Sequence, residues 1–224
     1  MENTEGILTS EPVKVKKSKK ASGFTRYMDI LRNGLFVFGL LNRLEKIGID
    51  ISPYYWVQEE AKPCPEPVIK DDALYGIRYL NKEELKAVCH LEPGEEYDKM
   101  MRDVENGQLV IALETNNIIA AYTFVELDNF VFKGRRFILK PNEAYLLNMW
   151  TFHDYRGRNL APYLRYRTYK LLSEKGIEVK YSITDYFNKS SIKFKKKLNA
   201  KQLYLYLAIV LFNKYKWNFT LRKY

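Results

Sequence analysis

The chain has 224 residues, 46% of them hydrophobic, and a net charge of +10. This size fits one main core with an appendage, and two cysteines and two histidines argue against a disulfide framework or a metal site. The longest apolar run, residues 203–212, is about half of what a bilayer span needs, and no secretory signal is recognisable, so we expect a cytoplasmic protein.

The charge is unevenly shared along the chain. Residues 156–224 contain seventeen Lys and Arg against three Asp and Glu, so this part carries +14 and residues 1–155 carry −4. We expect a partner with several negative charges at the C-terminal half, unless most of these lysines form a solvated face.

The first third of the chain is expected to lie outside the main domain. Residues 1–22 read as a flexible basic tail, and residues 23–68 as a helical and aromatic extension that ends in a proline-rich linker. Apolar residues recur at helical spacing over 24–49, and their face would cover the main domain, a second subunit or a membrane surface.

The aromatic cluster of this extension has two interpretations. Tyr54, Tyr55 and Trp56 would either pack in a core or form one wall of a pocket for a ring-shaped acceptor. Three prolines between residues 63 and 67 cannot continue a helix or a central strand, so the domain boundary is placed there and the main domain at 69–224.

The main domain begins with a strand, two helices and three further strands. Asn81 and Glu84 form the pattern of a helix capping box, and Asn116-Asn117 suits the turn of a hairpin. The predicted elements are a strand at 72–80, helices at 82–90 and 95–104, and strands at 108–115, 118–126 and 129–139.

A strand, a tight basic turn and a helix follow, at 144–152, 153–159 and 160–176. Three arginines, Arg156, Arg158 and Arg165, are expected within reach of the turn, which leads into a helix N-terminus with unpaired N–H groups. This arrangement favours a phosphate ligand, and the alternative is an ordinary connection with a solvated basic face. A strand at 177–184, a basic helix at 188–200 and a strand at 201–212 complete the order.

These elements carry a family resemblance. The turn Arg156-Gly-Arg-Asn-Leu-Ala161 resembles the Arg/Gln-x-x-Gly-x-Gly/Ala signature of the GCN5-related N-acetyltransferase (GNAT) superfamily, with Asn159 where glycine is usual. Asn188, Ser191 and Leu198 match the spacing of that family's last helix, with Asn199 again in place of glycine. Asparagine tolerates positive φ, so both exchanges suit a left-handed backbone. The resemblance covers about residues 72–212.

The resemblance implies a fold and a cofactor. The fold would be of the α+β class: a mixed, mostly antiparallel central sheet flanked by helices, here with the N-terminal helical extension. The cofactor would be acetyl-coenzyme A (acetyl-CoA). Its implied binding residues are Met149, Trp150 and Thr151 at the thioester, Arg156, Gly157, Arg158, Asn159, Leu160 and Ala161 at the pyrophosphate, and Asn188 and Ser191 at the pantetheine arm.

The residues for proton transfer are less clear from the resemblance. The family's tyrosine acid is replaced here by Lys195, so Tyr186, Tyr181 or a water molecule would protonate the thiolate instead. Glu143 and Asp185 are the candidate bases, Asn148 would polarise the acceptor, and His153 is assigned a structural role. The catalytic candidates are therefore Glu143, Asn148, Asp185 and Tyr186.

Two functions follow. The first is acyl-CoA dependent transfer, with acetyl as the expected group, to the primary amine of a small molecule or amino sugar. The second is a non-catalytic relative whose basic half binds an anionic partner, either nucleic acid, lipid or protein. A homodimer through the N-terminal helices and a peripheral membrane contact stay open, and nucleic acid is the less favoured partner.

Overall fold

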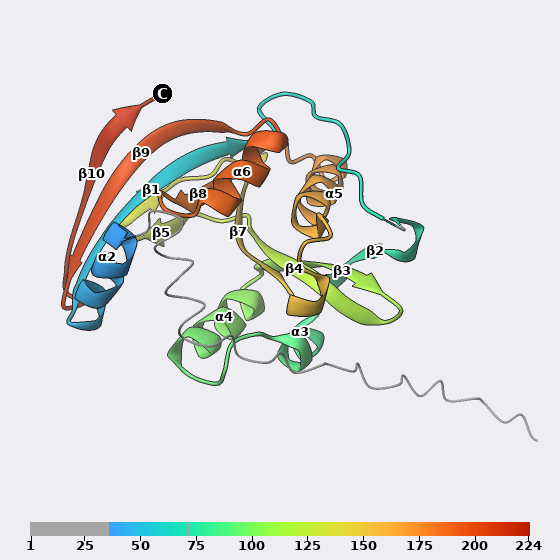
Figure 1. The fold of residues 1–224 in the computed structure, drawn as a ribbon, viewed down its shortest axis with the longest axis horizontal. Helices are drawn as coiled ribbons and strands as arrows, with labels where there is room; N and C mark the ends of the chain where they lie inside the picture. Colours follow the sequence, from blue (N-terminus) through green and yellow to red (C-terminus); the bar gives the residue numbers. More distant parts are fainter. Residues whose placement is uncertain (1–35, 71) are drawn as a thin grey trace, which may run out of the picture.

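A computed structural model describes residues 36–70 and 72–224, so the predicted tail and the first part of the predicted helical region lie outside the described residues. The described residues form an eight-stranded sheet in the order β10-β9-β1-β8-β7-β4-β3-β2, whose curvature is visible in Figure 1, and a separate two-stranded β5–β6 hairpin. All described neighbours in the sheet are antiparallel except β7 and β8. This confirms the predicted mixed, mostly antiparallel sheet.

The helices are α2 (Phe36–Lys46), α3 (Lys82–Val88), α4 (Glu95–Glu105), α5 (Leu160–Glu174) and α6 (Lys189–Lys197), with short 3-10 turns η1 (Asp72–Leu74) and η2 (His153–Tyr155). The strands are β1 (Ile49–Glu59), β2 (Gly76–Leu80), β3 (Leu109–Thr115), β4 (Ile118–Glu126), β5 (Phe130–Phe132), β6 (Arg135–Phe137), β7 (Glu143–Thr151), β8 (Val179–Asp185), β9 (Lys201–Leu211) and β10 (Tyr215–Lys223). No described helix is long and apolar enough to cross a membrane.

Helices cover both faces of the sheet because alternate strand residues are apolar on both sides. On one face, α5 and α6 bury a core that includes Leu146, Leu164 and Leu198. On the other face, α3 and α4 bury Ile119 and Tyr122 of β4, and the β5–β6 hairpin covers an aromatic cluster on β1, β7 and β9. The Asn81 capping box that starts α3 is present as predicted.

The N-terminal extension differs from its prediction. Residues 49–59 are not outside the main sheet but form β1, which lies between β8 and β9 and pairs with both. Tyr54, Tyr55 and Trp56 are accordingly at most 8% exposed. They therefore pack in the interior and do not form the wall of a pocket. Helix α2 packs against β1 of the same chain. Of the three expected partners for this apolar helical region, the described part therefore contacts the main domain.

Two further elements differ from prediction. The strand expected at 129–139 is a separate hairpin, broken at Lys133 and Gly134, which both have positive φ. Strand β10 was not predicted, and it adds the outer edge beyond β9.

Both asparagines that replace family glycines adopt the left-handed backbone that was predicted. Asn159 has φ 63° and Asn199 has φ 54°. Each side chain also donates a hydrogen bond to the proline-rich segment, Asn159 Nδ2 to the Val68 carbonyl at 2.9 Å and Asn199 Nδ2 to the Pro63 carbonyl at 2.8 Å. Glycine could adopt the backbone but could not make these bonds, so asparagine fastens the segment over α5 and α6.

Substitution of Asn159 should separate the contribution of its left-handed backbone from that of its side-chain hydrogen bond. We expect Asn159→Ala to destabilise the protein by about 2 kcal/mol, because it loses the hydrogen bond and strains a left-handed residue. Asn159→Gly should cost only about 1 kcal/mol, because it keeps the backbone relaxed. Urea denaturation measures both, with Asn106→Ala as the control, since Asn106 is exposed and has φ −83°. Equal losses for Ala and Gly would show that the backbone conformation contributes nothing.

Candidate functional site

The two parallel strands of the sheet separate along their length. β7 and β8 pair only at Glu143–Val179, Ala144–Lys180 and Tyr145–Tyr181. Beyond Tyr145, β7 continues to pair with β4 on its other side, and β8 continues with β1. Their facing edges are therefore open toward the C-terminal ends, and unpaired strand backbone is suited to bind an extended ligand.

The open edge of β7 presents backbone N–H groups in a defined direction. A bulge with Asn148 at φ 43° shifts the β4–β7 register, and after it the Phe152 N–H bonds to the Ala120 carbonyl of β4 at 3.0 Å. Since successive N–H groups along a strand point to opposite edges, those of Thr151 and Met149 point to the open edge. The sequence prediction named these two residues for backbone contact.

The turn after β7 leads from this edge to the N-terminus of α5. Gly157 has φ +80°, and a Cβ placed there would meet no atom within 4 Å, so the space beside the turn is open. Arg156 Nε donates to the Thr151 carbonyl and Arg158 Nη2 to the Asp154 carbonyl, both at 3.0 Å, which holds two guanidinium groups at the turn. Free N–H groups, a helix N-terminus and two arginines suit a doubly charged phosphate group.

The third arginine does not belong to this turn. Arg165 was expected within reach of the phosphate but is 3% exposed inside the core, where its Nε and Nη1 have no hydrogen-bond partner. The reason is helical geometry, because position 165 lies on the face of α5 that packs on the sheet.

A cavity of about 200 Å³ lies beside the bulge, on the α3 and α4 face of the sheet. It is lined by His90, Leu91, Glu96, Met100, Asn148, Met149 and Trp150. The His90 ring stacks on Trp150 with centroids 3.9 Å apart and planes 10° apart, and its Nδ1 lies 2.5 Å from the Tyr122 hydroxyl. The Arg156 guanidinium lies 5.0 Å from the same Trp150 ring.

The environment of His90 keeps its imidazole neutral. Burial lowers the pKa of His90, Arg156 lowers it further, and Glu96 acts in the opposite direction. A neutral, fixed imidazole at the wall of a cavity can accept a proton. The sequence prediction missed His90, because no local pattern links the end of α3 to β4 and β7.

Comparison with known proteins identifies the family. The model of the acetyltransferase (GNAT) family matches residues 74–200, more than half of the chain. The chain belongs to the GNAT acetyltransferase family. A search of the curated proteins finds no match.

Two solved GNAT structures with TM-scores above 0.5 share the fold at low identity. A GNAT acetyltransferase from Colwellia psychrerythraea superposes with TM-score 0.52 at 13% identity, over 73% of this chain and 57% of that one. The glucosamine N-acetyltransferase region of a fungal multi-domain β-N-acetylglucosaminidase gives 0.54 at 14%, over 78% and 23%. A GNAT acetyltransferase from Novosphingobium aromaticivorans gives 0.45 at 18%, over 73% and 66%. The chain thus spans less than two thirds of each of these structures.

In this GNAT domain, the predicted catalytic residues do not all meet. Glu143 lies at the closed end of β7 and β8, where its carboxylate accepts from the Lys140 N–H at 3.1 Å and the Tyr181 hydroxyl at 3.4 Å. It is therefore too far along the strand to act at the open end, and its assignment as a base is not supported.

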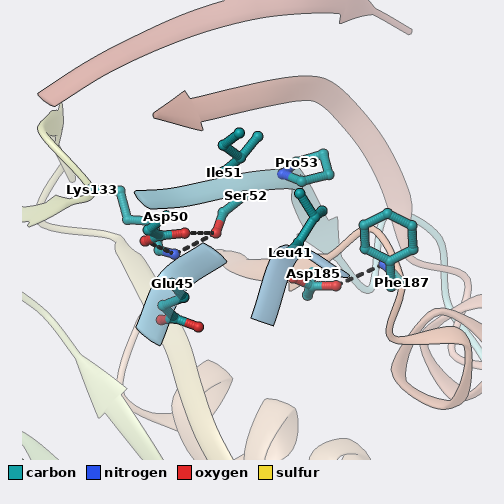
Figure 2. A pocket seen from close by; sticks show the side chains of 9 residues that line it. All are labelled: Leu41, Glu45, Asp50, Ile51, Ser52, Pro53, Lys133, Asp185 and Phe187. Carbon is teal, nitrogen blue, oxygen red and sulfur yellow. Dashed lines mark hydrogen bonds and ion pairs between the residues drawn. The ribbon is translucent and has the colours of Figure 1, made fainter. Parts of the chain in front are cut away.

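Asn148 and Asp185, in contrast, lie at the open ends of β7 and β8. Asp185 lines a second cavity, of about 190 Å³, with residues of α2, β1 and the hairpin, and accepts from the Phe187 N–H at 2.7 Å (Figure 2). Burial raises its pKa. Tyr186 follows β8, is 43% exposed and stacks on Tyr55 at 5.6 Å.

The residue in the place of the family's tyrosine is part of a buried polar cluster. Lys195 Nζ donates to Ser182 Oγ at 2.6 Å and Thr184 Oγ1 at 2.5 Å and lies 3.3 Å from Glu59 Oε1. Burial lowers the pKa of Lys195 to about 8, although Glu59 opposes the change. Burial alone would raise the pKa of Glu59, but Lys195 and Arg165 outweigh it and lower that pKa to about 2. The Tyr169 hydroxyl bonds to the other Glu59 oxygen.

The last helix is capped by the asparagine of its motif. Asn188 Oδ1 accepts from the Ser191 N–H at 3.0 Å and the Ser190 hydroxyl at 2.9 Å, so its side-chain oxygen is used by the cap of α6. Within the described residues, no group of three or more His, Cys, Asp or Glu is arranged to hold a metal ion.

Proposed function

We propose that this chain is an acetyl-CoA dependent N-acetyltransferase that acts on the primary amine of a small molecule or an amino sugar. One observation carries the proposal: the open edge of β7 runs without interruption into an N–H-rich turn and the N-terminus of α5. This arrangement offers donors to a thioester carbonyl and to a pyrophosphate along one path.

The residues that would bind acetyl-CoA, the acetyl donor, lie along this path. The N–H groups of Met149 and Thr151, on either side of Trp150, polarise the thioester carbonyl. Asn188 and Ser191 at the start of α6 flank the pantetheine arm. The pyrophosphate is held by the turn and the start of α5, that is by Arg156, Gly157, Arg158, Asn159, Leu160 and Ala161. Bound acetyl-CoA supplies the acetyl group as a thioester.

We place the acceptor in the two cavities beside the open ends of β7 and β8, on the sheet face opposite to α5 and α6. His90 takes a proton from the substrate ammonium, and Asn148 orients the resulting amine. The amine nitrogen then attacks the carbonyl carbon, the carbon–sulfur bond breaks, and the second proton of the nitrogen goes to the thiolate. Tyr186 is exposed near the end of β8 and remains our candidate for relaying that proton.

A small cationic acceptor suits these cavities. Their volumes, about 200 and 190 Å³, accommodate an amine or one sugar ring. Glu96 lines the first cavity and Asp185 the second, so each offers a carboxylate to an ammonium group. A glucosamine N-acetyltransferase region shares the fold, which supports an amino sugar. We place the reaction in the cytoplasm, where acetyl-CoA is available.

Binding of acetyl-CoA tests the proposal directly. At a hundred times its dissociation constant, acetyl-CoA should stabilise the wild type by about 2.7 kcal/mol, which a thermal shift assay detects as a rise of several degrees. Arg156→Glu should weaken binding at least about tenfold, because it replaces a cation with an anion beside the phosphates.

The matched control for this charge reversal is Arg102→Glu, at an exposed position of α4 away from the turn. It should leave acetyl-CoA affinity unchanged. No thermal shift of the wild type would refute the proposed function, and salt-sensitive binding to DNA in its place would support the non-catalytic alternative.

A further inference from the structure

Strand β9, in the outer part of the sheet between β10 and β1, is apolar on both faces. Tyr206, Ala208 and Val210 of β9 point to the aromatic core under the hairpin and are at most 7% exposed. The intervening residues Leu207 and Ile209 point to the other face and are only partly buried. A strand with one solvated face normally alternates apolar and polar residues, so this second apolar face needs another explanation.

Cross-strand pairing extends this second face over three strands. Each β10 aromatic lies opposite a β9 aliphatic residue, which in turn lies opposite a β1 residue. The rows, which together we call the aromatic sheet face, are Tyr215, Leu211 and Ile49; Trp217, Ile209 and Ile51; and Phe219, Leu207 and Pro53. Tyr215, Trp217 and Phe219 are 52%, 44% and 49% exposed. A contiguous exposed patch of this kind marks an interaction site.

The elements near β1 lie on the opposite side of the sheet. Figure 2 shows Leu41 and Glu45 of α2 on the side of Asp50 and Ser52, whereas Ile51 projects away from them. The hairpin also packs on that opposite side, against Tyr54 and Tyr206. The exposure of the three rings shows that no described element covers the aromatic sheet face.

The surroundings of this face are strongly basic. Residues 201–224 contain five Lys and Arg and no Asp or Glu, and of these Lys216 lies on the hairpin side of the sheet beside Gly134. Lys214 Nζ lies 5.4 Å from the Tyr215 ring, and the Arg222 guanidinium 4.6 Å from the Tyr224 ring. Helix α6, which packs on this same side of the sheet, exposes Lys193, Lys196 and Lys197. The face thus consists of aromatic and aliphatic side chains with a cationic margin.

We propose that the aromatic sheet face binds the surface of an anionic phospholipid bilayer, as a peripheral contact that is independent of acetyl transfer. Trp and Tyr favour the boundary between lipid headgroups and acyl chains, and each Lys or Arg near an anionic bilayer adds to the attraction. A symmetric second copy on the same face is disfavoured, because it would bring two cationic margins together without a carboxylate between them.

Vesicle sedimentation of the full chain tests this proposal. We expect binding to phosphatidylcholine vesicles with about 30% phosphatidylglycerol, at least about tenfold weaker binding to pure phosphatidylcholine, and release at about 0.5 M salt. The double variant Trp217→Thr, Phe219→Thr should bind at least about tenfold less, because it removes two interfacial rings while threonine keeps the strand. Lys214→Glu should weaken binding several-fold and reduce its salt dependence.

A control variant removes an apolar side chain elsewhere that is even more exposed than Trp217 and Phe219. Ile138→Thr, at a position 72% exposed beside the hairpin, should bind vesicles as the wild type does. Equal binding of the wild type and the double variant, or no binding to the anionic vesicles, overturns the proposal. Light scattering that shows a wild-type dimer, which the double variant converts to a monomer without any vesicle binding, would assign the face to a second copy and also overturn it.

Discussion

Replacement of Glu59 by Gln is expected to destabilise the protein by about 3–5 kcal/mol, because it removes the only carboxylate within the described cluster that faces the buried Lys195 and Arg165. Both cations would remain away from water, and Arg165 already lacks hydrogen-bond partners at two nitrogens. Urea denaturation measures the loss. Glu114→Gln, in a partly exposed pair with Arg78, should cost less than about 1 kcal/mol and serves as the control.

Two further measurements sharpen this test. The double variant Glu59→Leu, Lys195→Met should be more stable than Glu59→Gln, since a packed apolar pair leaves fewer charges uncompensated. The pKa of Glu59 is lowered in the folded state, so its contribution is complete above the ordinary carboxyl value of 4.5 and is lost as pH falls toward 2. The difference between wild type and Glu59→Gln should therefore shrink over that range. A constant difference would contradict the buried charge pair.

Replacement of His90 by Asn is expected to lower kcat for acetyl transfer by about 100-fold or more, because it removes the proposed proton acceptor. Asn can still bond to the Tyr122 hydroxyl, so the packing of α3 on β4 should be preserved. The measurement is thiol release from acetyl-CoA, with D-glucosamine and with water as acceptors. The affinity for acetyl-CoA should stay as in the wild type.

The pH profile distinguishes a base from a structural residue. The pKa of His90 is lowered, so wild-type kcat/KM should rise with pH through an inflection below 6.5, and that inflection should be absent in His90→Asn. The chain has two histidines, so NMR titration with His153→Gln for assignment gives the same pKa independently. An inflection that persists in His90→Asn would refute this role while leaving donor binding, and thus the family function, intact.

Local patterns predicted much of this fold. The hairpin of β3 and β4, the capping box of α3 and the positive φ of Asn159 and Asn199 depend on neighbouring residues, so the sequence contains their physical cause. The central position of β1 depends instead on pairing with β8 and β9, which lie more than a hundred residues away in the chain. The sequence of β1, an aromatic strand before a proline-rich segment, does not indicate that β8 and β9 are its partners.

The candidate site could be proposed from the sequence only where its residues are continuous in the chain. Met149 to Ala161 form one segment, and the turn could be recognised from it. His90, Tyr122 and Trp150 come from three elements, and their contact exists only in the folded sheet. Glu143 illustrates the opposite error: it is close to the site in sequence, but the strand carries it to the closed end.

The Trp150 ring contacts both His90 and Arg156, and Arg156 adds to the lowering of the His90 pKa by burial. While the Arg156 charge is uncompensated, it holds down the proton affinity of the imidazole. Phosphates arriving at the turn would cancel that charge and make His90 a stronger base. On the proposed function, acetyl-CoA bound at the turn would prepare His90 to deprotonate the acceptor, and we therefore expect sequential addition with acetyl-CoA binding first.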